Sequence, residues 1–259
     1  MKSVVVTGGS EGLGLAIAKA YGKAGLCVVL AARKEDKLKR AATELARMGI
    51  KTEICSVDLG NETGPAYLFS KYPDADILVN GAGIGRLGEV LKGSSEKDNN
   101  MLDLNCRSVM ALCCLYGKAM CERGSGLIVN IASTGAFQPG PYTALYYATK
   151  SFVLSYSRAL TEEWKDKGVH VSCVCPGPID TAFYAKSGGK VPWYAAKPDH
   201  IAEYVITKAP KKAVVICGLR DRLLLCIPTL IRMYFVKQDK QRILKKIAQE
   251  DQKTIEDII

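Results

Sequence analysis

Histidine is scarce in this 259-residue chain, and cysteine pairs at metal-binding spacing are missing. Only His170 and His200 occur, and none of the ten cysteines forms a C-x-x-C motif. These absences argue against a structural zinc site and a catalytic cysteine–histidine pair, so we expect no metal. The cysteines lie in apolar segments, as Cys113, Cys114 and Cys217 show, which predicts small buried side chains in a reducing cytosol.

Long apolar runs are missing as well. The best one, Leu223–Ile231, has nine residues and contains Pro228, whereas a membrane-spanning helix needs about 18. The first residues run directly into Thr7, Gly8 and Gly9, so they lack the apolar core of a signal peptide. We therefore expect a cytoplasmic protein. A composition of 48% apolar and 24% charged residues excludes disordered, collagen-like and coiled-coil classes.

The positive charge is concentrated near the carboxyl terminus. The chain carries a net charge of +10, and residues 209–247 hold ten Lys or Arg against Asp221 and Asp239, which leaves +8. This tail is too apolar for a nucleic-acid groove, so we expect no nucleic acid. It could form an amphipathic helix on anionic lipid, or a helix packed on the sheet or a neighbouring subunit. The sequence favours the second alternative.

Short apolar runs alternate with amphipathic stretches for about two hundred residues. The expected strands are Ser3–Thr7, Cys27–Ala32, Lys51–Asp58, Ile77–Asn80, Gly126–Ile131, Val169–Cys175 and Lys212–Cys217. Helices are expected over Lys34–Met48, Asp98–Glu122 and Ala144–Lys167. Nearly continuous apolar strands are typical of parallel sheets covered on both faces. The pattern predicts one doubly wound α/β domain over 1–259, with a basic apolar extension over about 218–259.

A glycine-rich turn joins the first expected strand to a helical run over Leu15–Tyr21. It reads Thr7-Gly8-Gly9-Ser10-Glu11-Gly12-Leu13-Gly14. Glycines allow a tight turn and the close approach of a pyrophosphate, which the amides of the helix N-terminus then face. A purely structural turn is the alternative, but the strand–turn–helix context favours a dinucleotide.

Three side chains form a candidate catalytic group. Ser133 follows the expected strand Gly126–Ile131, Tyr146 comes thirteen residues later, and Lys150 lies four residues beyond it. Tyr146 and Lys150 therefore share one helix face, and the ammonium should lower the pKa of the phenol. Tyr146 could then exchange a proton with a carbonyl or alcohol oxygen, while Ser133 donates a hydrogen bond to it. Tyr147 is a poorer candidate, because it lies three residues from Lys150.

These motifs, taken in order from about 3 to 183, resemble those of the short-chain dehydrogenase/reductase family. The resemblance implies an oxidoreductase with a three-layer Rossmann fold and a parallel sheet of seven strands. It also implies a homodimer or homotetramer assembled through the helices 98–122 and 144–167. Asn105 matches the family's fourth catalytic residue, which holds a water that links the lysine to solvent.

The cofactor choice depends mainly on Arg33. The strand Cys27–Ala32 ends in alanines, where an enzyme that prefers NAD(H) usually has an acidic residue. A guanidinium pairs instead with a 2′-phosphate, which favours NADP(H) over NAD(H). The resemblance implies cofactor contacts from Gly8, Ser10, Glu11, Gly12, Leu13, Gly14, Arg33, Asp58, Leu59, Asn80, Gly81, Ala82, Tyr146, Lys150, Pro176, Gly177, Ile179 and Thr181. Gly81 departs from the family pattern, which has asparagine there.

The family's substrate lid corresponds to residues 182–197. Its aromatic residues Phe183, Tyr184, Trp193 and Tyr194 could line an apolar pocket with Phe137 and Tyr142, or could simply pack the lid. A hydrophobic ketone or secondary alcohol is expected, with hydroxysteroids or bile acids favoured, although Arg86 could bind a carboxylate. A keto-lipid or keto-acyl reductase is the alternative, and a non-catalytic NADP(H)-binding regulatory protein is an alternative of another class.

Overall fold

The computed structural model describes residues 2–256, and the side chains of residues 2–249. Within them, seven parallel strands form one sheet in the order β3-β2-β1-β4-β5-β6-β7. The strands are β1 (Ser3–Thr7), β2 (Cys27–Ala32), β3 (Thr52–Ser56), β4 (Ile77–Asn80), β5 (Gly126–Ile131), β6 (Val169–Cys175) and β7 (Val214–Ile216). The predicted doubly wound sheet is confirmed. The predictions for β3 and β7 were too long at both ends.

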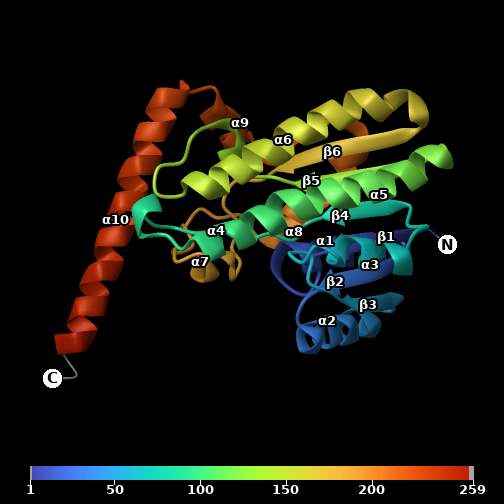
Figure 1. Ribbon diagram of the computed structural model, residues 1–259, viewed down its shortest axis with the longest axis horizontal. Coiled ribbons are helices and arrows are strands. Elements are labelled where there is room, and N and C mark those ends of the chain that lie inside the picture. The colour runs from blue at the N-terminus through green and yellow to red at the C-terminus, as the bar shows by residue number, and fades with distance from the viewer. Residues whose placement is uncertain (1, 257–259) are drawn as a thin grey trace.

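Helices cover both faces of the sheet (Figure 1). They are α1 (Gly12–Lys23), α2 (Glu35–Arg47), α3 (Gly64–Lys71), α4 (Ser95–Leu102), α5 (Ser108–Glu122), α6 (Ala144–Trp164), α7 (Phe183–Lys186), α8 (Pro198–Lys208), α9 (Leu219–Leu225) and α10 (Thr229–Glu256). Side chains of α1, α2 and α8 share one core with the sheet, and those of α3, α5 and α6 share the other. Three layers result.

Strand β1 shows why its sequence is apolar without alternation. Val4 and Val6 lie fully buried in the core beneath α1, α2 and α8, while Val5 lies fully buried in the opposite core. Successive side chains of a strand point to opposite faces, so a strand covered on both sides must be apolar throughout.

The helix predicted over Asp98–Glu122 is divided. A π-helical turn over Asp103–Arg107 separates α4 from α5. Hydrophobic periodicity does not reveal such a turn, because it inserts a residue without changing the composition. The turn places Asn105 at the sheet side, where 1% of its surface is exposed.

The last two helices lie beside the carboxyl ends of the strands. Figure 1 shows α10 as one long helix that runs across this end of the molecule, past α4 and α7, towards the C-terminus. None of the helices in the described part of the chain combines the length and apolar composition that membrane spanning requires.

The ten cysteines are all free thiols. Six are buried, as predicted, and they include Cys173 and Cys175 of β6. Cys114 and Cys226 are exposed, so the expectation of burial was wrong for these two. Cys114 lies at an exposed position of α5 and Cys226 directly follows α9, and an apolar sequence context does not distinguish such positions from buried ones.

Candidate active site

The predicted site residues gather at the carboxyl ends of the parallel strands. The loops after β1, β2, β3, β4 and β6 all emerge at this edge, and β1 and β4 are neighbours although they are far apart in the chain. The strand order reverses at this pair, which is where open α/β sheets bind ligands.

The glycine-rich turn after β1 forms a cradle suited to a pyrophosphate. Gly8 and Gly12 have φ angles of 69° and 55°, which favour glycine. A side chain on Gly14 would overlap the carbonyl group of Gly8, so the turn and helix can meet only with glycine there. No side chain caps the amino end of α1, which leaves its first amides available to an anion. The residues present therefore fit a dinucleotide.

Glu11, at the start of α1, joins this turn to two other elements. Its carboxylate pairs with Lys37 of α2 at 2.6 Å and with Lys186 of the lid helix α7. A Cβ on Gly12 would lie 3.3 Å from Thr181, so the beginning of the lid also approaches the turn. The lid and the glycine turn thus lie together at the predicted cofactor site.

Arg33 and Asp58, which follow β2 and β3, are neighbours. The guanidinium lies 3.8 Å from the carboxylate, and both side chains are more than half exposed. Both were expected at the adenosine end of a dinucleotide, and the structure brings them together. An exposed guanidinium keeps most of its donors free for another anion.

The turn after β4 is held from β1. The Thr7 hydroxyl accepts hydrogen bonds from the amides of Gly81 and Ala82, at 3.0 and 3.1 Å. A Cβ at Gly81 would lie 2.9 Å from the Thr7 carbonyl oxygen, which explains glycine where the family has asparagine. Asn80 points into the core and donates to Asn130 at 2.8 Å, so only its backbone faces the site.

The structure brings together Ser133, Tyr146 and Lys150. Lys150 Nζ lies 5.8 Å from the Tyr146 ring centroid and donates to the Ile131 carbonyl at 2.8 Å. Ser133 lies beside Tyr146, and its hydroxyl oxygen accepts from the Gly135 amide at 3.1 Å. Sequence reasoning identified this group, because two of its members are one helical turn apart.

The protonation of the group differs from the expectation. Burial raises the pKa of Tyr146, and the nearby Tyr147 adds to this, while the hydrogen bond from Ser133 opposes it. Burial also lowers the pKa of Lys150 to about 8. The predicted lowering of the Tyr146 pKa was therefore wrong for this structure, because desolvation of the phenol is the largest cause and raises the pKa. A phenol that stays protonated is suited to donate a proton.

Asn105 is placed beside the catalytic group by the π-helical turn. Its amide donates to the Ile84 carbonyl at 2.8 Å and to Thr149 Oγ1 at 3.1 Å, and its oxygen accepts from the Ile84 amide at 2.9 Å. Both N–H groups of the Asn105 side chain are therefore engaged. A water that links Lys150 to solvent would have to bind the Asn105 backbone instead. Thr149, which the sequence analysis missed, also donates to the Tyr146 carbonyl at 2.7 Å.

Aromatic residues of the lid reach Tyr146. The ring centroids of Phe183 and Tyr146 are 5.5 Å apart, and Tyr184 packs edge-on against Phe183. Trp193 is 96% exposed, so neither of the two alternatives, lining the pocket or packing the lid, holds for it. Arg86 forms a two-pronged ion pair with Asp98, at 3.0 and 3.2 Å, and is already neutralised.

Helix α9 contributes two residues that sequence reasoning did not find. Asp221 accepts a hydrogen bond from the Gly177 amide at 3.0 Å, and a side chain on Gly177 would overlap this carboxylate. The Arg220 guanidinium lies 3.7 Å from the centre of the Tyr194 ring in the lid. No local pattern predicts these contacts, because Asp221 and Gly177 are 44 residues apart.

Comparisons with known proteins agree with this geometry. The family model for short chain dehydrogenases matches residues 2–191. A 3-oxoacyl-(acyl-carrier-protein) reductase of Chlamydia muridarum is 34% identical over 185 residues, covering 70% of this chain and 75% of that protein. A short-chain dehydrogenase from Sphingobium yanoikuyae, solved with NADPH, is 25% identical with a TM-score of 0.81, over 95% of this chain and 96% of the other.

A 7β-hydroxysteroid dehydrogenase structure shares the fold, with a TM-score of 0.83 at 20% identity, over 91% of this chain and 96% of that one. The matched family model includes the glycine turn, Ser133, Tyr146 and Lys150. The chain therefore belongs to the short-chain dehydrogenase family of oxidoreductases.

Proposed function

We propose that this oxidoreductase interconverts a hydrophobic ketone and its secondary alcohol with NADP(H). The observation that carries the proposal is the placement of Tyr146 between the Ser133 hydroxyl and the ring of Phe183. A carbonyl oxygen at Tyr146 would meet a proton donor and a hydrogen-bond donor, while an apolar body would meet the lid. A hydroxysteroid or bile-acid type of substrate is favoured.

The chain's own residues supply the proton chemistry. When bound, the nicotinamide donates or accepts the hydride. Tyr146 gives its phenolic proton to the carbonyl oxygen of the substrate, and takes it back from the alcohol in the reverse direction. Ser133 would donate its hydroxyl proton to that oxygen, while its own oxygen accepts from the Gly135 amide.

Lys150 is the third member of the group with Ser133 and Tyr146, and its ammonium lies near the Tyr146 ring. One of its three N–H donors is engaged by Ile131, so two are available to cofactor hydroxyls. The cradle from Gly8 to Gly14 would hold the pyrophosphate, and the loops that carry Asp58 and Thr181 would hold the two ends of the cofactor.

The preference for NADP(H) over NAD(H) follows from Arg33. Its guanidinium stands exposed at the end of β2, where no acidic residue occupies the position of a ribose-binding carboxylate. A 2′-phosphate would form charge-assisted hydrogen bonds with it. The Asp58 carboxylate, 3.8 Å from the guanidinium, helps to orient it.

The apolar character of the substrate follows from the lid. Phe183 and Tyr184 face the site, and the nearby cation Arg86 is paired with Asp98 and so does not await a substrate carboxylate. A keto-acyl reductase is the second candidate, supported by the 34% identity to the 3-oxoacyl reductase. Both activities use the same catalytic group and differ in the shape of the lid.

We also propose a cytoplasmic homodimer or homotetramer. Helices α5 and α6 lie side by side, with Cys114 Sγ 3.6 Å from the Tyr156 hydroxyl. Their outer faces expose Met110 and Phe152, at 42% and 38%, which suits a subunit contact. The free thiols of Cys173 and Cys175, 3.8 Å apart, suit a reducing compartment.

Turnover of a substrate panel tests the proposal. The panel contains keto-steroids, oxo-bile acids, keto-acyl thioesters and small diketones, and NADPH and NADH oxidation are followed in parallel. Oxidation of NADPH with the polycyclic ketones is expected. Turnover of the acyl thioesters alone would select the second candidate. NADPH binding without turnover of any ketone would instead indicate the non-catalytic regulatory protein.

A further inference from the structure

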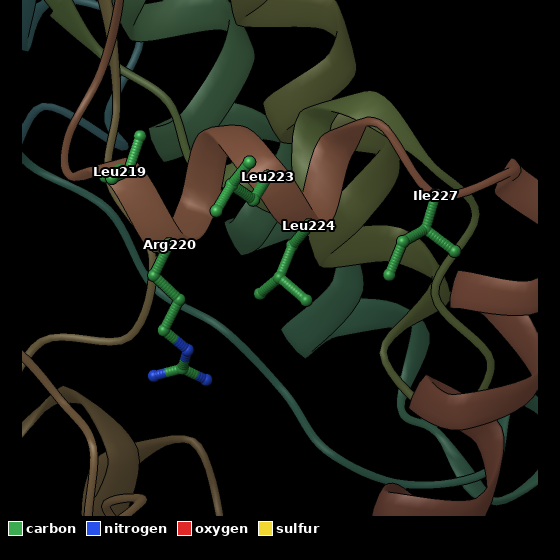
Figure 2. Close-up of a pocket in the computed structure, with 5 residues that line it drawn as sticks. All are labelled: Leu219, Arg220, Leu223, Leu224 and Ile227. Carbon is green, nitrogen blue, oxygen red and sulfur yellow. The ribbon is translucent and has the colours of Figure 1, made fainter.

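Helices α9 and α10 carry large apolar side chains that the described residues leave between 42% and 75% exposed. We call the set Leu219, Leu223, Leu224, Leu230, Tyr234 and Phe235 the extension face. Leu230 is 75% exposed and Phe235 is 62% exposed. The first three of these residues line a groove of about 420 Å³ together with Arg220 and Ile227, as Figure 2 shows. Six exposed apolar side chains grouped on two adjacent helices mark an interaction surface.

Polar side chains of the same two helices attach them to the domain. Asp221 binds the Gly177 amide, and the Arg232 guanidinium donates to Gln138 Oε1 at 2.8 Å. Further along α10, Gln241 donates to the Tyr142 hydroxyl at 2.6 Å. These contacts are made with loops at the carboxyl edge of the sheet, so the expected packing on the sheet itself does not cover the extension face.

The charge around this face selects the kind of partner. Residues 209–247 carry a net charge of +8, and their two acidic side chains are engaged, Asp221 by the Gly177 amide and Asp239 by Lys240. Two copies that met through this face would bring like charges together. An anionic surface would be attracted, and exposed cations such as Lys237 and Arg242 could contact it.

We propose that the extension face docks on an anionic lipid bilayer. The combination of an exposed apolar row, flanking basic residues and a helix too polar to span is that of a helix lying in the membrane interface. The apolar side chains enter the boundary of the acyl chains, and the cations meet the lipid phosphates. The contacts of Asp221, Arg232 and Gln241 keep the two helices attached to the domain.

Docking would place the substrate lid near the lipid. Arg220 covers the Tyr194 ring in the lid, and Gln241 holds Tyr142 in the loop before Tyr146. A hydrophobic ketone dissolved in the bilayer could then reach the site without crossing water. This last step rests on the proposed function, whereas the docking itself does not.

Vesicle co-sedimentation of the full chain, without substrate, tests the docking. Wild-type protein is expected to pellet with phosphatidylcholine vesicles that contain phosphatidylglycerol, and much less with phosphatidylcholine alone or at high salt. Phe235→Glu and Leu230→Glu should each weaken binding at least about tenfold, because each loses apolar burial and adds an anion. Tyr67→Glu is the matched control, since Tyr67 is an exposed aromatic residue of α3.

Three outcomes would overturn the proposal. The first is no wild-type binding to anionic vesicles at low salt. The second is equal binding by wild type and Phe235→Glu, since attraction by charge alone would then suffice. The third is a sedimentation coefficient of lipid-free Phe235→Glu that is lower than that of lipid-free wild type. Such a decrease would mean that the variant has lost a subunit contact made by the extension face. Unchanged NADPH affinity and melting temperature of each variant establish that it is folded, and a failed substrate panel would leave the docking result intact.

Discussion

The Asn105 side chain forms a two-way bridge with the backbone of Ile84. The Asn105 amide donates to the Ile84 carbonyl at 2.8 Å, and its oxygen accepts from the Ile84 amide at 2.9 Å. This pairing ties the π-helical turn between α4 and α5 to the loop after β4. Asn105 thereby fixes the wall of the site next to Lys150, and a Cβ on Gly83 would lie between these two side chains.

Asn105→Asp should destabilise the protein although the two side chains have the same shape. A carboxylate cannot donate to Ile84 or Thr149, and it would leave buried acceptors unpaired. A loss of about 2–4 kcal/mol in the free energy of unfolding is expected, measured by urea denaturation. Asn100→Asp is the control, because Asn100 is exposed on α4. Equal losses in both variants would contradict the bridge.

Tyr146→Phe should abolish most turnover while cofactor binding persists. Removal of the proton donor is expected to lower kcat by about 10³-fold. The dissociation constant of NADPH, measured by fluorescence, should stay within a few-fold of wild type. Tyr147→Phe is the matched control, because the Tyr147 ring packs on Gly135 and Gly140 and lies outside the catalytic group. A Tyr147→Phe variant as inactive as Tyr146→Phe would refute the assignment.

Arg33→Ala should reduce the preference for NADPH. Loss of a charge-assisted contact to the 2′-phosphate is expected to raise the KM for NADPH by about 10–100-fold, with the KM for NADH little changed. Steady-state kinetics with both cofactors provides the measurement. Arg47→Ala, which removes an exposed arginine at the other end of α2, should change neither value. Parallel changes for the two cofactors would argue against a phosphate contact.

Lys150→Met should make stability less dependent on pH. The lowered pKa of Lys150, about 8, means that the unfolded chain binds a proton between pH 8 and the ordinary lysine pKa while the folded chain does not. The free energy of unfolding contributed by this group therefore rises with pH across that window. The difference between variant and wild type in urea denaturation at pH 7.5 and 9.5 isolates this contribution.

Between pH 7.5 and 9.5, the free energy of unfolding of wild type should rise by about 1–3 kcal/mol relative to that of Lys150→Met. Lys208→Met, at an exposed lysine of α8, should show none. A pH-independent difference between Lys150→Met and wild type would mean that Lys150 keeps an ordinary pKa in the folded protein.

Asp221→Ala should weaken cofactor binding through the turn that Asp221 holds. Loss of the hydrogen bond to the Gly177 amide is expected to raise the KM for NADPH about fivefold. Asp221→Asn keeps an acceptor oxygen and should restore most of the affinity. An alanine variant with unchanged KM but lower stability would limit Asp221 to a structural role.

Local chemistry made much of the fold predictable. Strands such as β1 are recognisable because burial on both faces demands a continuous apolar sequence. The cradle is recognisable because the backbone at Gly8 and Gly12 and the close contact at Gly14 favour glycine. The pairing of Tyr146 with Lys150 needs only the period of a helix. The length of the strand β3 and the break at Asp103 were not predictable, since neighbouring elements set them.

The sequence by itself determined the alternation of strands and helices, the glycine turn and the shared helix face of Tyr146 and Lys150, because these depend on residues close together in the chain. Only the tertiary structure decided the pKa of Lys150, the pairing of Asn105 with Ile84 and that of Asp221 with Gly177. Desolvation and long-range hydrogen bonds depend on which distant segments surround a group. The exposure of the extension face was decided in the same way, by what the rest of the chain leaves uncovered.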